Sequence, residues 1–376
     1  MKKNEILGLT LLSSSLLVGN EIELKPYGFI RVDSISHSAE FNNNQAPILV
    51  QKQPAGREVD SGLTIHPRLT RVGLDVQRDI EETKGSLTGK IEIDFQNGGS
   101  ESRELLRLRH AYLEYRKNNY SILVGQTWQT VSRMAPTANA DTLMWGAGNT
   151  GDRSPQIRFA YTSPVLEDGL LGFELALQQI GTVENKGQAK TNFGNQPAYQ
   201  ARVSMDIPLW TEKPMHFALG YHTATETLSE KGFGKKDFEQ NGVFTELELP
   251  ITSYLDIRGE YFTGKNISDL RGGILFGINP LTDQEIETTG YWIESRIKPM
   301  NNLTCSIGYS QDNPEDTQIV NGLQSLNEAA WGTVHYDLVK DVTLGLEYIR
   351  WATEYKNDQR LVANRINGFV KWNFGG

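Results

Sequence analysis

Basic side chains recur at alternate positions of short segments in which every second residue is apolar. In RLTRVGLDVQ, Arg71 and Asp75 lie on one side of an extended chain, and Val72 and Leu74 lie on the other. A guanidinium group matches a carboxylate or phosphate, and rings of Arg and Lys favour anions. The residues predicted to line a common face in this way are Arg71, Lys90, Arg107, Arg109, Arg158, Arg202, Arg258 and Arg296.

Acidic side chains share that face, so a second interpretation stays open. The carboxylates predicted to lie beside the arginines are Asp75, Glu92, Asp94, Glu174, Asp206, Glu246, Asp256, Glu260 and Glu294. Such neighbours can form lateral ion pairs that only stiffen a sheet. Arg107, Arg109 and Arg158 are the first candidates for contact with a solute.

Patterns typical of an enzyme are absent from the sequence. There is no G-x-S-x-G, no H-E-x-x-H and no P-loop. The six histidines show no metal-ligand spacing. We therefore expect no catalytic residue, no metal site, no cofactor and no enzymatic activity.

The elements that must position these side chains are strands of about ten residues. A strand of this length, tilted by about 45°, spans roughly 23 Å, which matches the apolar band of an outer-membrane β-barrel. The sixteen predicted strands cover 24–33, 68–77, 86–95, 105–115, 120–128, 156–162, 170–179, 198–207, 215–222, 242–249, 254–262, 291–297, 303–310, 330–338, 342–351 and 365–374.

The connections between these strands alternate in length. The short ones are 116–119, 163–169, 208–214, 250–253, 298–302 and 339–341. The long ones are 34–67, 129–155, 180–197, 223–241, 263–290 and 311–329. This alternation predicts an all-β fold, a transmembrane antiparallel barrel of about 16 strands with long extracellular loops and short periplasmic turns. Closure requires the last strand to pair with the first near Gly28.

Aromatic rings on the apolar faces suit the two membrane interfaces. They are Tyr112, Phe159, Tyr161, Phe173, Tyr199, Phe217, Tyr221, Tyr261, Tyr291, Tyr309, Tyr336, Tyr348 and Trp372. A soluble β-sandwich would use the same rings in its core. The one-sided placement of the long connections favours the barrel.

The N-terminus has the pattern of an export signal. Lys2 and Lys3 precede an apolar run over 6–18 that is too short to span a membrane as a helix. We predict a signal peptide over 1–20 and one barrel domain over 21–376; a retained amphipathic helix is the alternative. A net charge of −9 argues against nucleic acid as a partner.

The connection 129–155 is too apolar for a free surface loop. An inward-folded constriction loop would bury its apolar residues, and so would packing at the axis of a trimer. Asp141, Asp152 and Arg153 would then help set the charge at the narrowest point, and Trp145 is a constriction-loop residue in the apolar part of the same connection.

Motifs in the N-terminal third resemble the DcaP-like outer-membrane porins of Gram-negative bacteria. The sharpest match is RLRHAY, which begins at Arg107, followed by GQTW, which begins at Gly125. GFIRVD, TRVGL and GKIEIDF in the first three strands add to the resemblance. It implies a sixteen-stranded barrel in the outer membrane, assembled as a homotrimer, that passes small anionic solutes such as dicarboxylates.

The expected function is passive diffusion of small, mostly anionic solutes, with outer-membrane lipid and two further copies of the chain as partners. A general or sugar-selective porin is the alternative, because Trp292, Trp331 and Trp351 face inward in the predicted register. An outer-membrane hydrolase and a barrel that binds partners through its loops are further alternatives.

Overall fold

The computed structural model of the chain describes residues 16–17, 22–53, 61–96, 104–166, 168–179, 196–230 and 234–375. The predicted signal peptide lies outside this set apart from residues 16–17. No helix among the described residues is long and apolar enough to cross a membrane.

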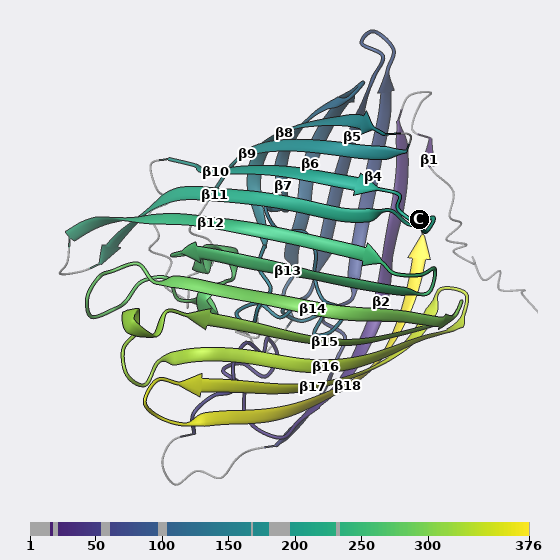
Figure 1. The fold of residues 1–376 in the computed structure, drawn as a ribbon. Coiled ribbons are helices and arrows are strands. Elements are labelled where there is room, and N and C mark those ends of the chain that lie inside the picture. The colour runs from purple at the N-terminus through teal and green to yellow at the C-terminus, as the bar shows by residue number, and fades with distance from the viewer. Residues whose placement is uncertain are drawn as a thin grey trace, which may run out of the picture.

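One antiparallel sheet contains all of the strands (Figure 1). Their bounds are β1 Leu16–Leu17, β2 Glu23–His37, β3 Gly62–His66, β4 Arg71–Ile80, β5 Gly85–Asp94, β6 Arg107–Lys117, β7 Tyr120–Trp128, β8 Arg153–Val165, β9 Gly169–Gln178, β10 Ala198–Ile207, β11 Met215–Glu230, β12 Gly234–Pro250, β13 Leu255–Lys265, β14 Glu287–Met300, β15 Leu303–Pro314, β16 Gln324–Val339, β17 Val342–Tyr355 and β18 Arg360–Gly375. Three short 3-10 helices lie in the connections: η1 Ser268–Leu270, η2 Gly273–Leu275 and η3 Asp316–Gln318.

The sheet closes on itself as a barrel of sixteen strands. Strands β3 and β4 both pair with β2 and together form one interrupted strand, and the two-residue β1 adds only a short edge. Closure joins β18 to β2, with Phe374 opposite Gly28. The predicted fold class and the predicted closure are therefore confirmed.

The interruption between β3 and β4 corrects the predicted strand 68–77. Pro67 has no backbone N–H to donate to the ladder, and Thr70 N donates to Pro67 O at 2.9 Å in a tight turn. The Thr70 side chain replaces the missing ladder contact, because its Oγ1 accepts from Arg31 N at 3.1 Å. The chain thus leaves the sheet after β3, turns at residues 67–70 and rejoins the sheet as β4.

Other differences from the predicted bounds fall mostly at the end with long connections. The predicted loop 223–241 is largely a paired hairpin, in which β11 continues to Glu230 and β12 begins at Gly234. Thr223, Thr225 and Thr227 maintain the two-residue alternation there, and β-branched residues favour strands. At the opposite end the connections are short, as predicted, with Asn118 and Asp341 in left-handed turn conformations.

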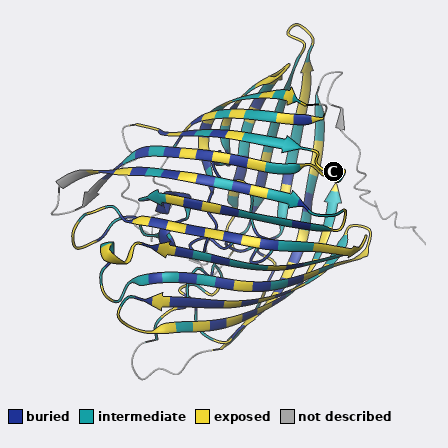
Figure 2. Ribbon diagram, in the orientation of Figure 1, coloured by how far each residue is buried: buried dark blue, intermediate teal, exposed yellow. Residues whose placement is uncertain are grey.

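Along many strands, exposed residues alternate with buried or half-buried ones (Figure 2). Along β14, Tyr291 and Ile293 are exposed on the outer wall, whereas Trp292 and Glu294 are buried on the inner wall. The outer wall therefore carries an apolar belt, and the inner wall at β14 is covered by other segments of the chain inside the barrel.

Chain segments from the connections provide this inner covering. Trp292, Trp331 and Trp351 pack in one apolar cluster with Phe41 from residues 38–53 and Met144 from residues 129–152. Because the three tryptophans are buried under these segments, they do not form an open aromatic track along the inner wall.

Candidate functional site

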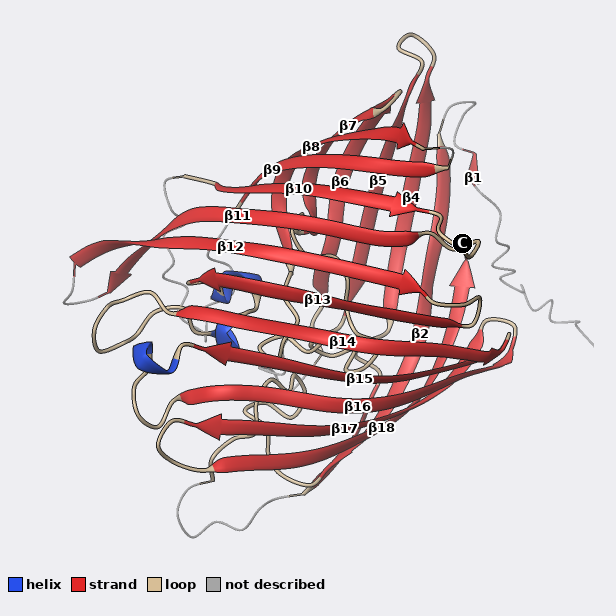
Figure 3. Ribbon diagram, in the orientation of Figure 1, coloured by secondary structure: helices blue, strands red, loops and turns tan. Residues whose placement is uncertain are grey.

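Residues 129–152 run through the inside of the barrel between β7 and β8 (Figure 3). Thr130 N donates to Gln200 Oε1 of β10 at 2.8 Å, and Asn139 N donates to Glu347 of β17 at 3.2 Å. Between these points the segment, here called the crossing loop, follows the inner wall from β10 to β17.

Four buried glutamates, one each from β12, β13, β14 and β17, hold the crossing loop; we call them the carboxylate row. Its members are Glu246, Glu260, Glu294 and Glu347. Glu246 accepts from the backbone N–H groups of Arg133 and Met134 at 2.5 and 2.7 Å. Ser132 Oγ donates to Glu260 at 2.5 Å, and Thr137 N donates to Glu294 at 3.0 Å.

The carboxylate row supplies hydrogen-bond acceptors to the irregular backbone of the crossing loop. A buried segment without helix or sheet leaves N–H groups that need acceptors, and ionised carboxylates are the strongest available. The four glutamates are therefore occupied by the crossing loop rather than by anything that moves through the barrel.

Two further connections pack on the crossing loop. From 266–286, the carbonyls of Arg271 and Leu270 accept from the N–H groups of Gly146 and Gly151, both at 2.8 Å. From 38–53, Pro47 O accepts from Thr142 Oγ1 at 2.9 Å. The three segments form one layer against the wall of β12–β18.

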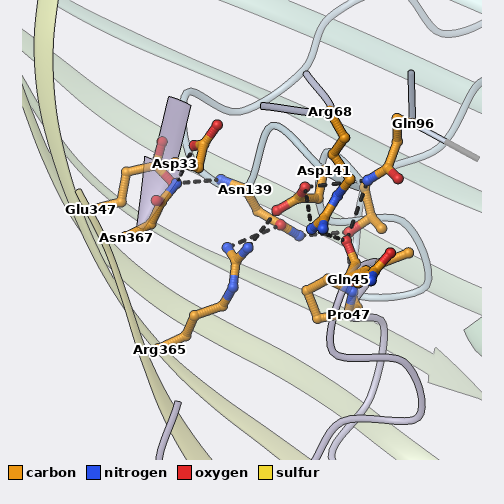
Figure 4. A network of polar contacts seen from close by, with 12 residues as sticks. Asp33, Gln45, Pro47, Arg68, Gln96, Asn139, Asp141, Glu347, Arg365 and Asn367 are labelled. Carbon is orange, nitrogen blue, oxygen red and sulfur yellow. Dashed lines mark hydrogen bonds and ion pairs between the residues drawn. The ribbon is translucent and has the colours of Figure 1, made fainter. Parts of the chain in front are cut away.

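The predicted constriction residue Asp141 belongs to the crossing loop and lies among polar side chains that come from the wall (Figure 4). It accepts from Arg68 Nη2 and Gln96 Nε2, each at 3.2 Å, and pairs with Arg365. Burial tends to raise the pKa of the Asp141 carboxyl, but the Arg365 and Arg68 guanidinium groups outweigh it and hold that pKa below its usual value.

Two of the other predicted constriction residues have partners within the layer, and the third, Arg153, stands beside it at the start of β8. Asp152 pairs with Arg271 at 2.6 Å, and the guanidinium of Arg271 lies 4.4 Å from the centre of the Trp145 ring. Arg153 stacks on Trp128, with its guanidinium carbon 4.5 Å from the ring centre. Asp141, Asp152 and Trp145 thus hold the layer to itself and to the wall, whereas Arg153 packs on the wall strand β7.

Three of the predicted pore-lining arginines meet on the opposite wall. Arg109 contacts Glu92 at 2.6 Å and Asp94 at 3.0 Å. Arg107 pairs with Asp94 at 2.6 Å, and Arg71 lies 3.5 Å from Glu92. We call Arg71, Arg107 and Arg109 the basic cluster; it holds three guanidinium groups for two carboxylates, and the side chains of Arg71 and Arg107 are each 29% exposed.

The remaining predicted residues are distributed around the barrel. Arg202 pairs with Glu246, Arg258 with Glu294, and Arg296 with Glu248 and Asp256, so these three brace the wall under or beside the layer. Lys90 and Arg158 lie on the less covered wall with the basic cluster. Lys90 pairs with Asp75 at 2.8 Å, and Arg158 approaches Glu174 at 3.5 Å.

Two inner residues escaped the sequence-based prediction. Arg133 of the crossing loop pairs with Glu174 of β9. The alternation of strand residues could not identify Arg133, because it lies in a long connection outside the predicted strands. Tyr112 was expected on the outer face, but a β-bulge at Arg109 shifts the alternation, because Glu92 faces His110 while Ile93 faces Leu108. Tyr112 consequently lines an inner cavity with Glu114 and Arg158.

Within the described ranges, no group of three or more His, Cys, Asp or Glu side chains is arranged to hold a metal ion. The polar residues of the described interior form ion pairs and hydrogen bonds, with the carboxylate row under the crossing loop on one wall and the basic cluster on the other.

Solved structures resemble the whole chain, although no protein-family model and no curated protein matches its sequence. The outer-membrane channel DcaP of Acinetobacter baumannii superimposes with a TM-score of 0.76 at 20% identity, over 94% of this chain and 97% of that one. An anion-selective porin from Comamonas acidovorans gives 0.60 at 13% identity, over 94% and 100%. OmpT, an outer-membrane protein of Vibrio cholerae, gives 0.56 at 13% identity, over 95% and 99%.

These matches extend over nearly the full length of both chains, so the resemblance covers the barrel and its connections together. The predicted likeness to DcaP-like porins is confirmed at the level of the fold. The chain therefore has the fold of the outer-membrane porins.

Proposed function

We propose that this protein is a passive diffusion channel in the outer membrane of a Gram-negative bacterium and that it prefers small anions. The observation that carries the proposal is the unequal use of charge inside the barrel. The crossing loop occupies the carboxylate row on one wall, whereas the basic cluster on the other wall has one guanidinium group in excess.

An excess of fixed positive charge beside a passage attracts anions, and the low-dielectric barrel wall focuses that field. The arginines also offer bidentate geometry to a carboxylate. Short dicarboxylates are therefore the solute class that we propose. The anion-selective Comamonas porin, which has the same fold, supports this choice.

The test is the reversal potential of the purified protein in planar bilayers under a KCl gradient. Replacing Arg107 and Arg109 by Gln removes two cations, takes both arginine partners from Asp94 and leaves Glu92 with Arg71 at 3.5 Å. We expect the reversal potential to move toward cation preference. Arg350→Gln, on the exposed outer face of β17, is the matched control and should leave it unchanged. An unchanged reversal potential in the double variant would contradict the proposal.

We also propose a homotrimer that contacts outer-membrane lipid elsewhere on its surface. The outward residues of β2–β5, all within the described strands, include no aromatic ring, whereas Tyr199, Tyr221 and Tyr291 stand on the outer faces of later strands. Leu63 and Ile65 of β3 are instead 69% and 67% exposed. An aliphatic patch without interfacial rings suits contact with a second copy. One similar structure, OmpT of Vibrio cholerae, is described in a trimer form.

The alternatives receive less support. A sugar track would need accessible rings, and Trp292, Trp331 and Trp351 are covered by the layer. A hydrolase would need a nucleophile beside a base, and the inner carboxylates are paired with arginines or with the crossing loop. We therefore propose a channel without enzymatic activity.

A further inference from the structure

A cavity of about 560 Å³ lies on the inner wall of β6–β9, near the end of the barrel with short turns. Arg116, Arg133 and Arg158 line it, together with the carboxylates Glu114 and Glu174. It is separate from the basic cluster, because none of Arg71, Arg107 and Arg109 lines it.

The charges of this cavity are unbalanced in the same direction as those of the basic cluster. Arg133 and Arg158 share the single carboxylate of Glu174; Arg133 Nη1 donates to it at 2.9 Å, and Arg158 Nη1 donates at 3.5 Å. Arg116 pairs with Glu114 at 2.9 Å. Three guanidinium groups thus face two carboxylates, and the long contact leaves Arg158 weakly held.

The backbone of Arg133 is held independently of Glu174. Its backbone N–H donates to Glu246 at 2.5 Å, and the neighbouring Met134 N donates to the same carboxylate at 2.7 Å. The crossing loop therefore fixes the backbone of Arg133 at one side of the cavity, while β8 fixes the backbone of Arg158 at the other. Both guanidinium groups reach the Glu174 carboxylate that lies between them, so two cations share one anion at this point of the cavity.

The wall offers a second set of donors further along the strands. Ser121 and Asn119 line the same cavity as Arg158. Leu123 of β7 pairs with Arg158 of β8, and the backbone of Ser121 lies two residues, about 7 Å, further along β7. The cavity therefore offers neutral hydrogen-bond donors at a place displaced along the strands from the Arg158 backbone, which suits an elongated anion with a carboxylate at each end.

We propose that this cavity, here called the exit site, binds a short dicarboxylate through Arg133 and Arg158 at one end and through Ser121 and Asn119 at the other. The inference rests on the proposed anion channel and adds a second binding step to it. With long connections outside the cell, a solute reaches the exit site after the basic cluster and leaves it toward the periplasm.

Succinate is the probe. Bilayer recordings measure how its concentration on either side blocks the KCl current of the wild-type channel. In the double variant Arg133→Gln, Arg158→Gln we expect the half-blocking concentration to rise about tenfold or more, since a charged hydrogen-bonded pair contributes about 1.5–3 kcal/mol. Arg158→Lys keeps the charge but loses the bidentate geometry, and should give a smaller rise. Arg350→Gln, on the outer face, should block like wild type.

The outcomes separate the two proposals. If the wild-type channel prefers anions in KCl but succinate blocks the double variant as well as wild type, the exit site alone is overturned. The exit site alone is also overturned if the wild-type channel prefers anions but succinate does not block it. A wild-type channel without anion preference overturns the proposed function. If the double variant does not insert into bilayers, the Arg158→Lys variant decides by the same comparison.

Discussion

Removing the carboxylate of Glu294 should release the crossing loop without opening the barrel. Glu294 is buried and accepts from Thr137 N at 3.0 Å, from Trp331 Nε1 at 3.0 Å and from Arg258 Nε at 2.9 Å. Breaking a buried ion pair by removing one partner costs about 3–5 kcal/mol, because the other charge stays buried without compensation. Glu294→Ala should therefore destabilise the folded interior by about this amount.

Glu294→Gln retains the shape and one acceptor oxygen, so we expect a smaller loss, about 1–3 kcal/mol. The backbone pairing of β14 with β13 and β15 involves no side chain, so the barrel wall should persist. Single-channel recording is the assay. A loosened crossing loop should increase current noise in the open state, strongly in Glu294→Ala and weakly in Glu294→Gln.

The matched control is Glu287→Gln, which changes an exposed glutamate of the same strand. It should leave both the noise and the denaturant midpoint of unfolding as in wild type. If Glu294→Ala has the noise and the unfolding midpoint of wild type, the carboxylate row does not hold the crossing loop, and the reasoning is wrong.

Three further predictions concern other parts of the interior and the wall. The pKa of Asp141 is depressed in the folded state, so its ion pairs with Arg68 and Arg365 stabilise the fold at any pH above the carboxyl pKa of the unfolded chain. This stability is lost as the pH falls through the lower pKa of the folded state, so acid should destabilise wild type. In unfolding titrations, Asp141→Asn should be less stable than wild type at neutral pH and should lack this part of the acid dependence. Gly125 has φ +130°, and an added Cβ would lie 2.2 Å from Ala111 O. Gly125→Ala should therefore destabilise the β6–β7 pair by at least about 1–3 kcal/mol. The control Gly368→Ala, which has open space at the position of the added Cβ, should have the unfolding midpoint of wild type. Trp351 is fully buried and donates to Asn327 at 2.9 Å, so Trp351→Ala should cost about 3–5 kcal/mol, and an unfolding midpoint equal to that of wild type would contradict the packing described above.

The strands could be predicted because the signal is local. Tyr120–Trp128 and Ala198–Ile207 have the bounds that alternation alone indicates, since each residue records which face it occupies. The bulge at Arg109 could not be predicted in this way. It inserts one residue without breaking the apolar pattern, and it reverses the side on which Tyr112 lies.

The inner contacts were beyond prediction from the sequence for a different reason. Residues more than a hundred positions apart form them, as Ser132 and Glu260 or Asn139 and Glu347 do. The sequence indicated that arginines and carboxylates share a face, but it did not distinguish carboxylates bound to arginines from carboxylates bound to backbone N–H groups. That distinction depends on the course of the crossing loop, which binds Glu246 and Glu294 in addition to their arginine partners but does not bind Glu92 or Asp94 in the basic cluster.

The most direct test of the account is the sign of the reversal potential of the wild-type channel under a KCl gradient. The charge asymmetry between the carboxylate row and the basic cluster predicts that chloride permeates more readily than potassium, and that the preference weakens as salt screens the fixed charges. A reversal potential of the opposite sign, or one near zero at low salt, would contradict the account.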